Sequence, residues 1–161
     1  MEISYTGIVA EGFGFASGRA RGAASPFSAG TLTLQAPHFA ARGLDLAALV
    51  PGLRWGTINI RLSAPLRLVA PDWTLRGVDW TVGEPDPAAR IAPEDFSFLR
   101  CRLRIEGAEV SGLIYHPHPE TKPDLNAHDP HVVEVIAPPI AALRPGAPAA
   151  LIVRKDAYAA F

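Results

Sequence analysis

The chain has 161 residues, 48% of them hydrophobic, which predicts one globular domain over residues 1–161 with a sizeable core. Its formal net charge of −1, with Lys122 and Lys155 the only lysines, excludes a broad basic surface for nucleic acid, and no apolar window is long enough for a membrane-spanning helix. The single cysteine, Cys101, excludes an intramolecular disulfide; we expect a packing role for it, no signal peptide and a cytoplasmic location.

The first predicted strand, Ile3–Val9, is followed by a glycine-spaced loop that carries two guanidinium groups. Backbone N–H groups of such a loop can face phosphate, and arginines add charge-assisted hydrogen bonds. The alternative is a surface linker, since the loop has neither a Walker A sequence nor a dinucleotide-binding glycine pattern. The residues concerned are Gly12, Gly14, Gly18, Arg19, Arg21 and Gly22.

A second strand is predicted over Gly30–Gln35, where Thr-Leu-Thr-Leu alternates. The segment Pro37–Val50 is the best helix candidate, and Asp45 can cap a late start. Pro51-Gly52 then ends it.

The stretch Gly56-Thr57-Ile58-Asn59-Ile60-Arg61-Leu62 has the alternation of a half-buried strand. Thr57 and Asn59 lie two residues apart and therefore emerge on the same face. Their neutral oxygens, next to a glycine, suit a hard cation such as Mg²⁺ that keeps most of its waters. The alternative is a solvent-facing polar side of the strand.

Further short strands fill the remainder, including a hairpin about Glu106-Gly107. Many short strands with one or two short helices predict a mainly β domain, a small barrel. These strands are Pro65–Val69, Leu75–Val82, Phe98–Ile105, Val110–Tyr115, His131–Ile136 and Ala149–Arg154.

A histidine-rich segment runs from His116 to His131 and offers a different chemistry. His-x-His and His-x-x-His spacings suit transition metals such as Zn²⁺ or Ni²⁺. The alternative is a solvated loop stiffened by prolines. The candidate ligands are His116, His118, Glu120, Asp124, His128, Asp129 and His131.

The order of three stretches along the chain resembles that of a known family. The stretches are the glycine-spaced loop, Gly56–Leu62 and His131-Val132-Val133-Glu134-Val135-Ile136-Ala137-Pro138. The chain resembles the CTP-dependent riboflavin kinases, best known from archaea, over roughly residues 5–153. That family carries a Gly-Thr-Leu-Asn strand and a later Ile-Glu-Ile-Ile-Ala-Pro stretch. The resemblance implies a single-domain, six-stranded cradle-loop β-barrel.

The resemblance also implies roles for particular residues. Thr57 and Asn59 match the Mg²⁺ ligands, and Gly12 and Gly14 match the start of the nucleotide-holding loop. Glu134 matches an acidic residue near the flavin end of the site.

In the family a Thr-x-His stretch precedes that acid. His128 stands six residues before Glu134, with Asn126 at the threonine position and Thr121 as the alternative match. The resemblance therefore implies that these residues bind the substrate.

The implied function is Mg²⁺-assisted transfer of a nucleoside triphosphate's terminal phosphate, CTP favoured, to riboflavin or a similar small molecule. Glu134 would orient or deprotonate the acceptor hydroxyl. Two alternatives stay open: a non-catalytic flavin- or nucleotide-binding module, and a metal-dependent protein using the His116–His131 segment.

Overall fold

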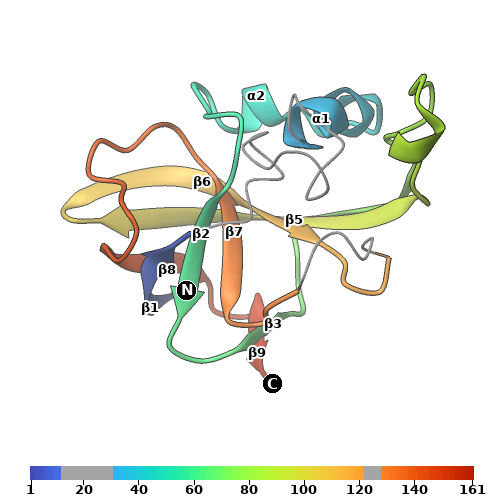
Figure 1. The fold of residues 1–161 in the computed structure, drawn as a ribbon. Helices are drawn as coiled ribbons and strands as arrows, with labels where there is room; N and C mark the ends of the chain where they lie inside the picture. Colours follow the sequence, from blue (N-terminus) through green and yellow to red (C-terminus); the bar gives the residue numbers. More distant parts are fainter. Residues whose placement is uncertain (12–30, 122–127) are drawn as a thin grey trace.

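The computed structural model describes residues 1–11, 31–121 and 128–161 of the chain. The described residues form a mainly β fold with two α-helices, which confirms the predicted class (Figure 1). The elements in chain order are β1 (Glu2–Ala10), α1 (Thr31–Ala41), α2 (Leu46–Leu49), β2 (Ile58–Leu62), β3 (Leu66–Leu68), β4 (Trp73–Val78), the 3₁₀ helix η2 (Pro87–Ala89), β5 (Glu94–Ile105), β6 (Ala108–Pro117), β7 (Val132–Ile136), β8 (Pro148–Arg154) and β9 (Tyr158–Ala160).

Six strands of the larger sheet form a closed ring of antiparallel pairings. The sheet order is β4-β5-β6-β7-β2-β1-β8, and a further pairing of β5 with β8 closes the ring. Strand β4 extends the sheet beyond the ring, and β3 pairs with β9 in a separate two-stranded sheet. No helix in the described ranges is both long and apolar enough to cross a membrane.

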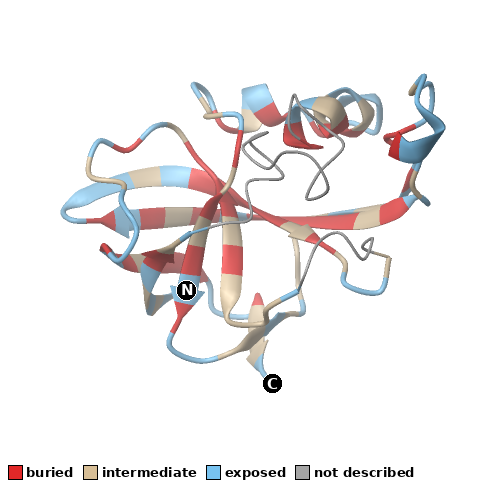
Figure 2. Ribbon diagram, viewed as in Figure 1, coloured by how far each residue is buried: buried red, intermediate tan, exposed pale blue. Residues whose placement is uncertain are grey.

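Two apolar cores lie on opposite sides of the strands. The first gathers alternate residues of all six ring strands, such as Val9, Ile60 and Leu103. The second lies between the helices and the sheet, where Phe39 of α1 packs edge-on against Phe96 and Phe98 of β5. Figure 2 shows the resulting alternation of buried and more exposed residues along the strands.

Cys101 is part of the first core, as the sequence predicted. It is 6% exposed, and burial raises the pKa of its thiol to about 12. A thiol with so high a pKa carries almost no thiolate at neutral pH, so Cys101 packs and does not react.

The predicted hairpin about Glu106-Gly107 is confirmed. Strand β6 pairs along its whole length with residues 96–105 of β5, and the pairing ends with Ile105 opposite Ala108. The two turn residues have φ values of 47° and 84°. Positive φ at both central positions is the geometry of a two-residue turn that matches the twist of the strands.

The strand predicted over Gly30–Gln35 is wrong in its described part, because residues 31–35 belong to α1. Leu32, Gln35 and Phe39 are all buried, and their spacing of three and four residues is helical. So short a Thr-Leu-Thr-Leu run fits either period, and packing against the aromatic residues of β5 favours the helix.

The helix predicted over Pro37–Val50 is divided. Pro37 lies inside α1, and Gly43, with φ of 89°, separates α1 from α2. The predicted cap is confirmed: the Asp45 carboxylate accepts hydrogen bonds from the backbone N–H groups of Ala47 and Ala48.

The strand predicted over Leu75–Val82 extends too far, since β4 ends at Val78.

A buried indole and a buried carboxyl meet beside the second core. The Trp80 Nε1–H donates to Glu94 Oε2 at 2.7 Å, and the two residues are 4% and 2% exposed. Trp80→Phe keeps an aromatic ring and removes the donor, so we expect it to lower the free energy of unfolding by about 1.5–3 kcal/mol. Urea unfolding measures this, with Trp55→Phe as the control because Trp55 is 46% exposed. Equal stability of both variants would contradict the expectation.

Candidate functional site

Strand β2 presents Asn59 on the face opposite the first core. Ile58, Ile60 and Leu62 are buried in that core, which fixes the register of the strand. Asn59 is half-buried on the other face, and Thr57 immediately precedes the strand. The alternation read from the sequence is therefore confirmed.

Strand β7 brings Glu134 to the same place. Asn59 and Glu134 are directly paired across β2 and β7, so their side chains lie next to each other. The Thr57 hydroxyl donates to Glu134 Oε1 at 3.0 Å, across 77 residues of sequence. A hydroxyl, a carboxamide and a carboxylate thus form one half-buried oxygen cluster, named here the Thr57–Asn59–Glu134 cluster.

Tyr115, which the sequence analysis did not single out, lies on the strand next to Glu134. Tyr115 on β6 is paired with Glu134, and its hydroxyl donates to Gln35 Oε1 of α1 at 2.7 Å. Burial first, and then the nearby charges of Glu134 and Glu94, hold the pKa of Tyr115 well above its ordinary value. Tyr115 is therefore a neutral donor that links the cluster to α1. Because the pattern of residues 30–35 predicts a strand where α1 forms, this contact could not be predicted from the sequence.

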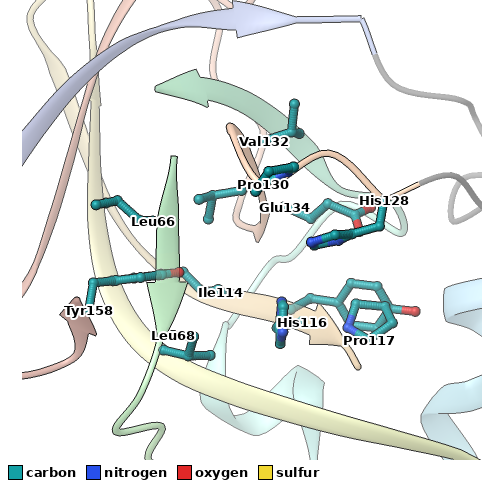
Figure 3. A pocket seen from close by; sticks show the side chains of 12 residues that line it. Leu66, Leu68, Ile114, His116, Pro117, His128, Pro130, Val132, Glu134 and Tyr158 are labelled. Atoms are coloured by element: carbon teal, nitrogen blue, oxygen red, sulfur yellow. The ribbon is translucent and has the colours of Figure 1, made fainter. Parts of the chain in front are cut away.

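A small pocket opens beside Glu134 (Figure 3). Leu66, Leu68 and Tyr158 line one end of it, and His116, His128 and Glu134 lie around the other end. Its volume is about 40 Å³. Since about 10–15 Å³ holds one water, the pocket has room for an ion, a few waters or the end of a hydroxyl-bearing chain, and not for a ring system.

Of the other predicted substrate-binding residues, one lies beside Glu134 and one does not. His128 lines the pocket together with Glu134. Thr121 lies elsewhere: its hydroxyl accepts a hydrogen bond from the backbone N–H of Asp95 at 2.8 Å. Asn126 lies outside the described residues. So do the five residues predicted to bind nucleotide: Gly12, Gly14, Gly18, Arg19 and Arg21.

The histidine-rich segment divides into two groups. Asp129 pairs with Arg61 of β2 at 2.7 Å, and the His131 N–H first, then this guanidinium, lower the pKa of the Asp129 carboxyl. His131 Nδ1 lies 3.4 Å from the Leu62 carbonyl oxygen. His128 instead contacts His116. The described residues at the end of this segment therefore contact β2 through Asp129 and His131, and β6 through His128. The predicted ligand Asp124 lies outside the described residues.

A scan against protein-family models found no match for the chain, and a search of curated proteins found no significant match.

Proposed function

We propose that this protein is a Mg²⁺-assisted phosphotransferase of the CTP-dependent riboflavin-kinase type. It would transfer the terminal phosphate of a nucleoside triphosphate, CTP favoured, to a primary hydroxyl of riboflavin or a similar small molecule. The observation that carries the proposal is the Thr57–Asn59–Glu134 cluster, in which residues of two separate sequence stretches meet. The ring of β5, β6, β7, β2, β1 and β8 adds support, since it has the six strands expected of a cradle-loop barrel.

The donor set of the cluster fits Mg²⁺. Hard cations prefer oxygen ligands, and Mg²⁺ is usually held by few protein oxygens while it keeps several waters. The Thr57 hydroxyl and the Asn59 carboxamide would hold the ion, with the Glu134 carboxylate adjacent. When bound, Mg²⁺ neutralises charge on the phosphates of the nucleotide.

Glu134 has two roles in this proposal. It accepts the Thr57 hydroxyl proton in a hydrogen bond, which directs the oxygen lone pairs of Thr57 away from the carboxylate. It also lines the pocket, where an acceptor hydroxyl would enter. As general base, Glu134 would take the proton of the acceptor hydroxyl. The hydroxyl oxygen would bond to the terminal phosphorus of the nucleotide as the nucleoside diphosphate leaves.

Phosphate binding is assigned to the glycine-spaced loop. Backbone N–H groups from Gly12 to Gly22, with Arg19 or Arg21, would hold the nucleotide phosphates. Phosphoryl transfer requires positioning and charge neutralisation more than a covalent nucleophile, so this division of roles is chemically sufficient.

A turnover assay tests the proposal. Untagged protein is incubated with riboflavin, Mg²⁺ and each of CTP, ATP, GTP and UTP, and FMN is measured by chromatography. We expect FMN with CTP, and no FMN when Mg²⁺ is chelated. Absence of FMN with all four nucleotides would overturn the riboflavin-kinase proposal.

A further inference from the structure

An imidazole and two carboxylates meet where β6 ends. Asp95 lies near the start of β5, and His118 and Glu120 lie in the segment that follows β6. One ligand atom from each of the three residues lies within 4.8 Å of the other two. They are named here the Asp95–His118–Glu120 group. None of the three lines the pocket beside Glu134.

Backbone hydrogen bonds hold this group together at its base. The His118 N–H donates to the Asp95 carbonyl oxygen at 2.9 Å, and the Thr121 N–H donates to the His118 carbonyl oxygen at 3.1 Å. The Asp95 N–H donates in turn to Thr121 Oγ1 at 2.8 Å. Residues 118–121 therefore form a turn that is closed against β5. Side chains supported in this way are positioned before a ligand binds.

A buried hydroxyl fixes the orientation of the His118 ring. Nε2 of His118 lies 2.7 Å from Ser97 Oγ, which also contacts the Thr74 hydroxyl at 2.9 Å. Ser97 is 3% exposed, so it supports the ring from inside the protein and is not placed to attack a substrate. Metal-binding histidines commonly have a hydrogen-bond partner of this kind on the nitrogen that does not bind the metal.

The other ring nitrogen of His118 points to Glu120. The distance from Nδ1 to Glu120 Oε1 is 3.0 Å, and a proton joins the two atoms in the hydrogen bond. A metal ion that binds both atoms takes the place of that proton. Atoms that share an ion with bonds of about 2.1 Å lie about 3.0–3.5 Å apart. The Glu120 side chain is 65% exposed, so it can move to admit an ion from solvent.

The Asp95 carboxylate already holds a cation on one oxygen. Oδ1 accepts the Gly77 N–H at 2.8 Å, and Oδ2 pairs with Arg76 Nη1 at 3.0 Å. The Arg76 side chain is 70% exposed. Ion pairs with an exposed partner are weak, so a divalent cation can displace the guanidinium from Oδ2 while Oδ1 stays fixed by the backbone.

We propose that Asp95, His118 and Glu120 bind one divalent transition-metal ion such as Zn²⁺. One imidazole nitrogen with two carboxylate oxygens suits Zn²⁺ or Co²⁺, whereas Mg²⁺ prefers oxygen alone. Three protein ligands leave a fourth position for water, as in zinc sites that react rather than only stabilise. The site is chemically separate from the Thr57–Asn59–Glu134 cluster.

Calorimetric titration of the untagged full chain with Zn²⁺ tests this site. We expect one ion per wild-type chain. Asp95→Asn and Glu120→Gln each remove a charged ligand at nearly constant shape, and Asp95→Asn keeps the acceptor for the Gly77 N–H. Each should weaken Zn²⁺ binding by at least about 10-fold, a loss known even for residues that only support metal ligands. Circular dichroism verifies that the variants are folded.

Arg76→Gln gives a change in the opposite direction. It removes the cation that competes for Asp95 Oδ2, so Zn²⁺ should bind more tightly, by up to about 5-fold, the most that an exposed ion pair contributes. A general loss of structure does not produce tighter binding. If Arg76→Gln binds Zn²⁺ no more tightly than the wild type, Asp95 is not a ligand and the three-residue site is overturned.

The chain supplies matched controls. Asp156 pairs with Arg154 on an exposed surface, much as Asp95 pairs with Arg76, so Asp156→Asn should bind Zn²⁺ like the wild type. His131→Ala should do the same, since His131 Nδ1 lies near the Leu62 carbonyl oxygen. No ion bound by the wild-type chain, or a loss in either control equal to that in Glu120→Gln, would overturn the proposal.

Two further variants separate this site from its neighbours. Asn59→Ala should keep Zn²⁺ binding, which makes the test independent of the kinase proposal. His128→Ala should also keep it, because His128 lines the pocket that contains Glu134. Zn²⁺ binding that is lost in His128→Ala and kept in Glu120→Gln would place the ion in that pocket and overturn the proposal.

Discussion

An Asn59→Ala protein is expected to lose Mg²⁺-dependent turnover by about 100-fold or more while it keeps its fold. Asn59 is half-buried on the face opposite the first core, so its truncation leaves the packing of Ile58 and Ile60 unchanged. The substitution removes one of two proposed protein ligands to Mg²⁺. Metal ions contribute several kcal/mol to transition-state stabilisation, and each 1.4 kcal/mol is a factor of ten in rate.

The measurement is FMN formation as a function of Mg²⁺ concentration. The variant should require a higher Mg²⁺ concentration for half-maximal rate, a readout that a purely structural defect does not produce. Ser111→Ala is the control, because it truncates an exposed polar side chain on β6 away from the cluster. Wild-type turnover in Asn59→Ala would remove the metal role from Asn59.

The second large effect is expected from Gly7→Ala in β1. Gly7 is paired with Leu62 of β2 on one side and with Ala149 of β8 on the other. A Cβ atom at this position would lie 2.3 Å from the carbonyl oxygen of Arg61, which is backbone. The substitution therefore forces β1 and β2 apart, and we expect a loss of about 3 kcal/mol or more, at the upper end for a single small-to-large change.

Urea unfolding followed by circular dichroism measures this loss. Ser4→Ala is the matched control on the same strand, since Ser4 is exposed, and it should change stability by no more than about 0.5 kcal/mol. If Gly7→Ala unfolds at the same urea concentration as Ser4→Ala, the close approach of β1 to β2 is not a constraint on the fold.

Strands with a clear period of two, and turns with specific residues, could be predicted from the sequence. Ile58, Ile60 and Leu62 are buried as their alternation indicates, and Glu106-Gly107 forms the expected turn. The strand prediction for residues 31–35 was wrong, because the choice between helix and strand there depends on aromatic residues of β5 that are distant in sequence.

In the candidate site, too, the sequence indicates individual residues but not which of them meet. The sequence pattern indicates Thr57 and Asn59, and the family resemblance implies Glu134, yet the meeting of the three residues depends on the pairing of β2 with β7. Tyr115 carries no local signal, since an apolar strand with an occasional hydroxyl is ordinary. Its partner, Gln35, lies 80 residues away.

The pairing of β1 with β8 has a consequence for how the chain reaches its fold. Glu2 lies opposite Arg154, so the ring cannot close until almost the whole chain is available. Pairings of such long sequence separation are slow to form, because loop-closure entropy must be overcome before they contribute stability. During synthesis the β5–β6 hairpin can form as soon as it emerges, whereas β1 must wait unpaired on its β8 side. Until then that edge of β1 is open to pairing with other chains, and this interval is when the protein is most exposed to aggregation.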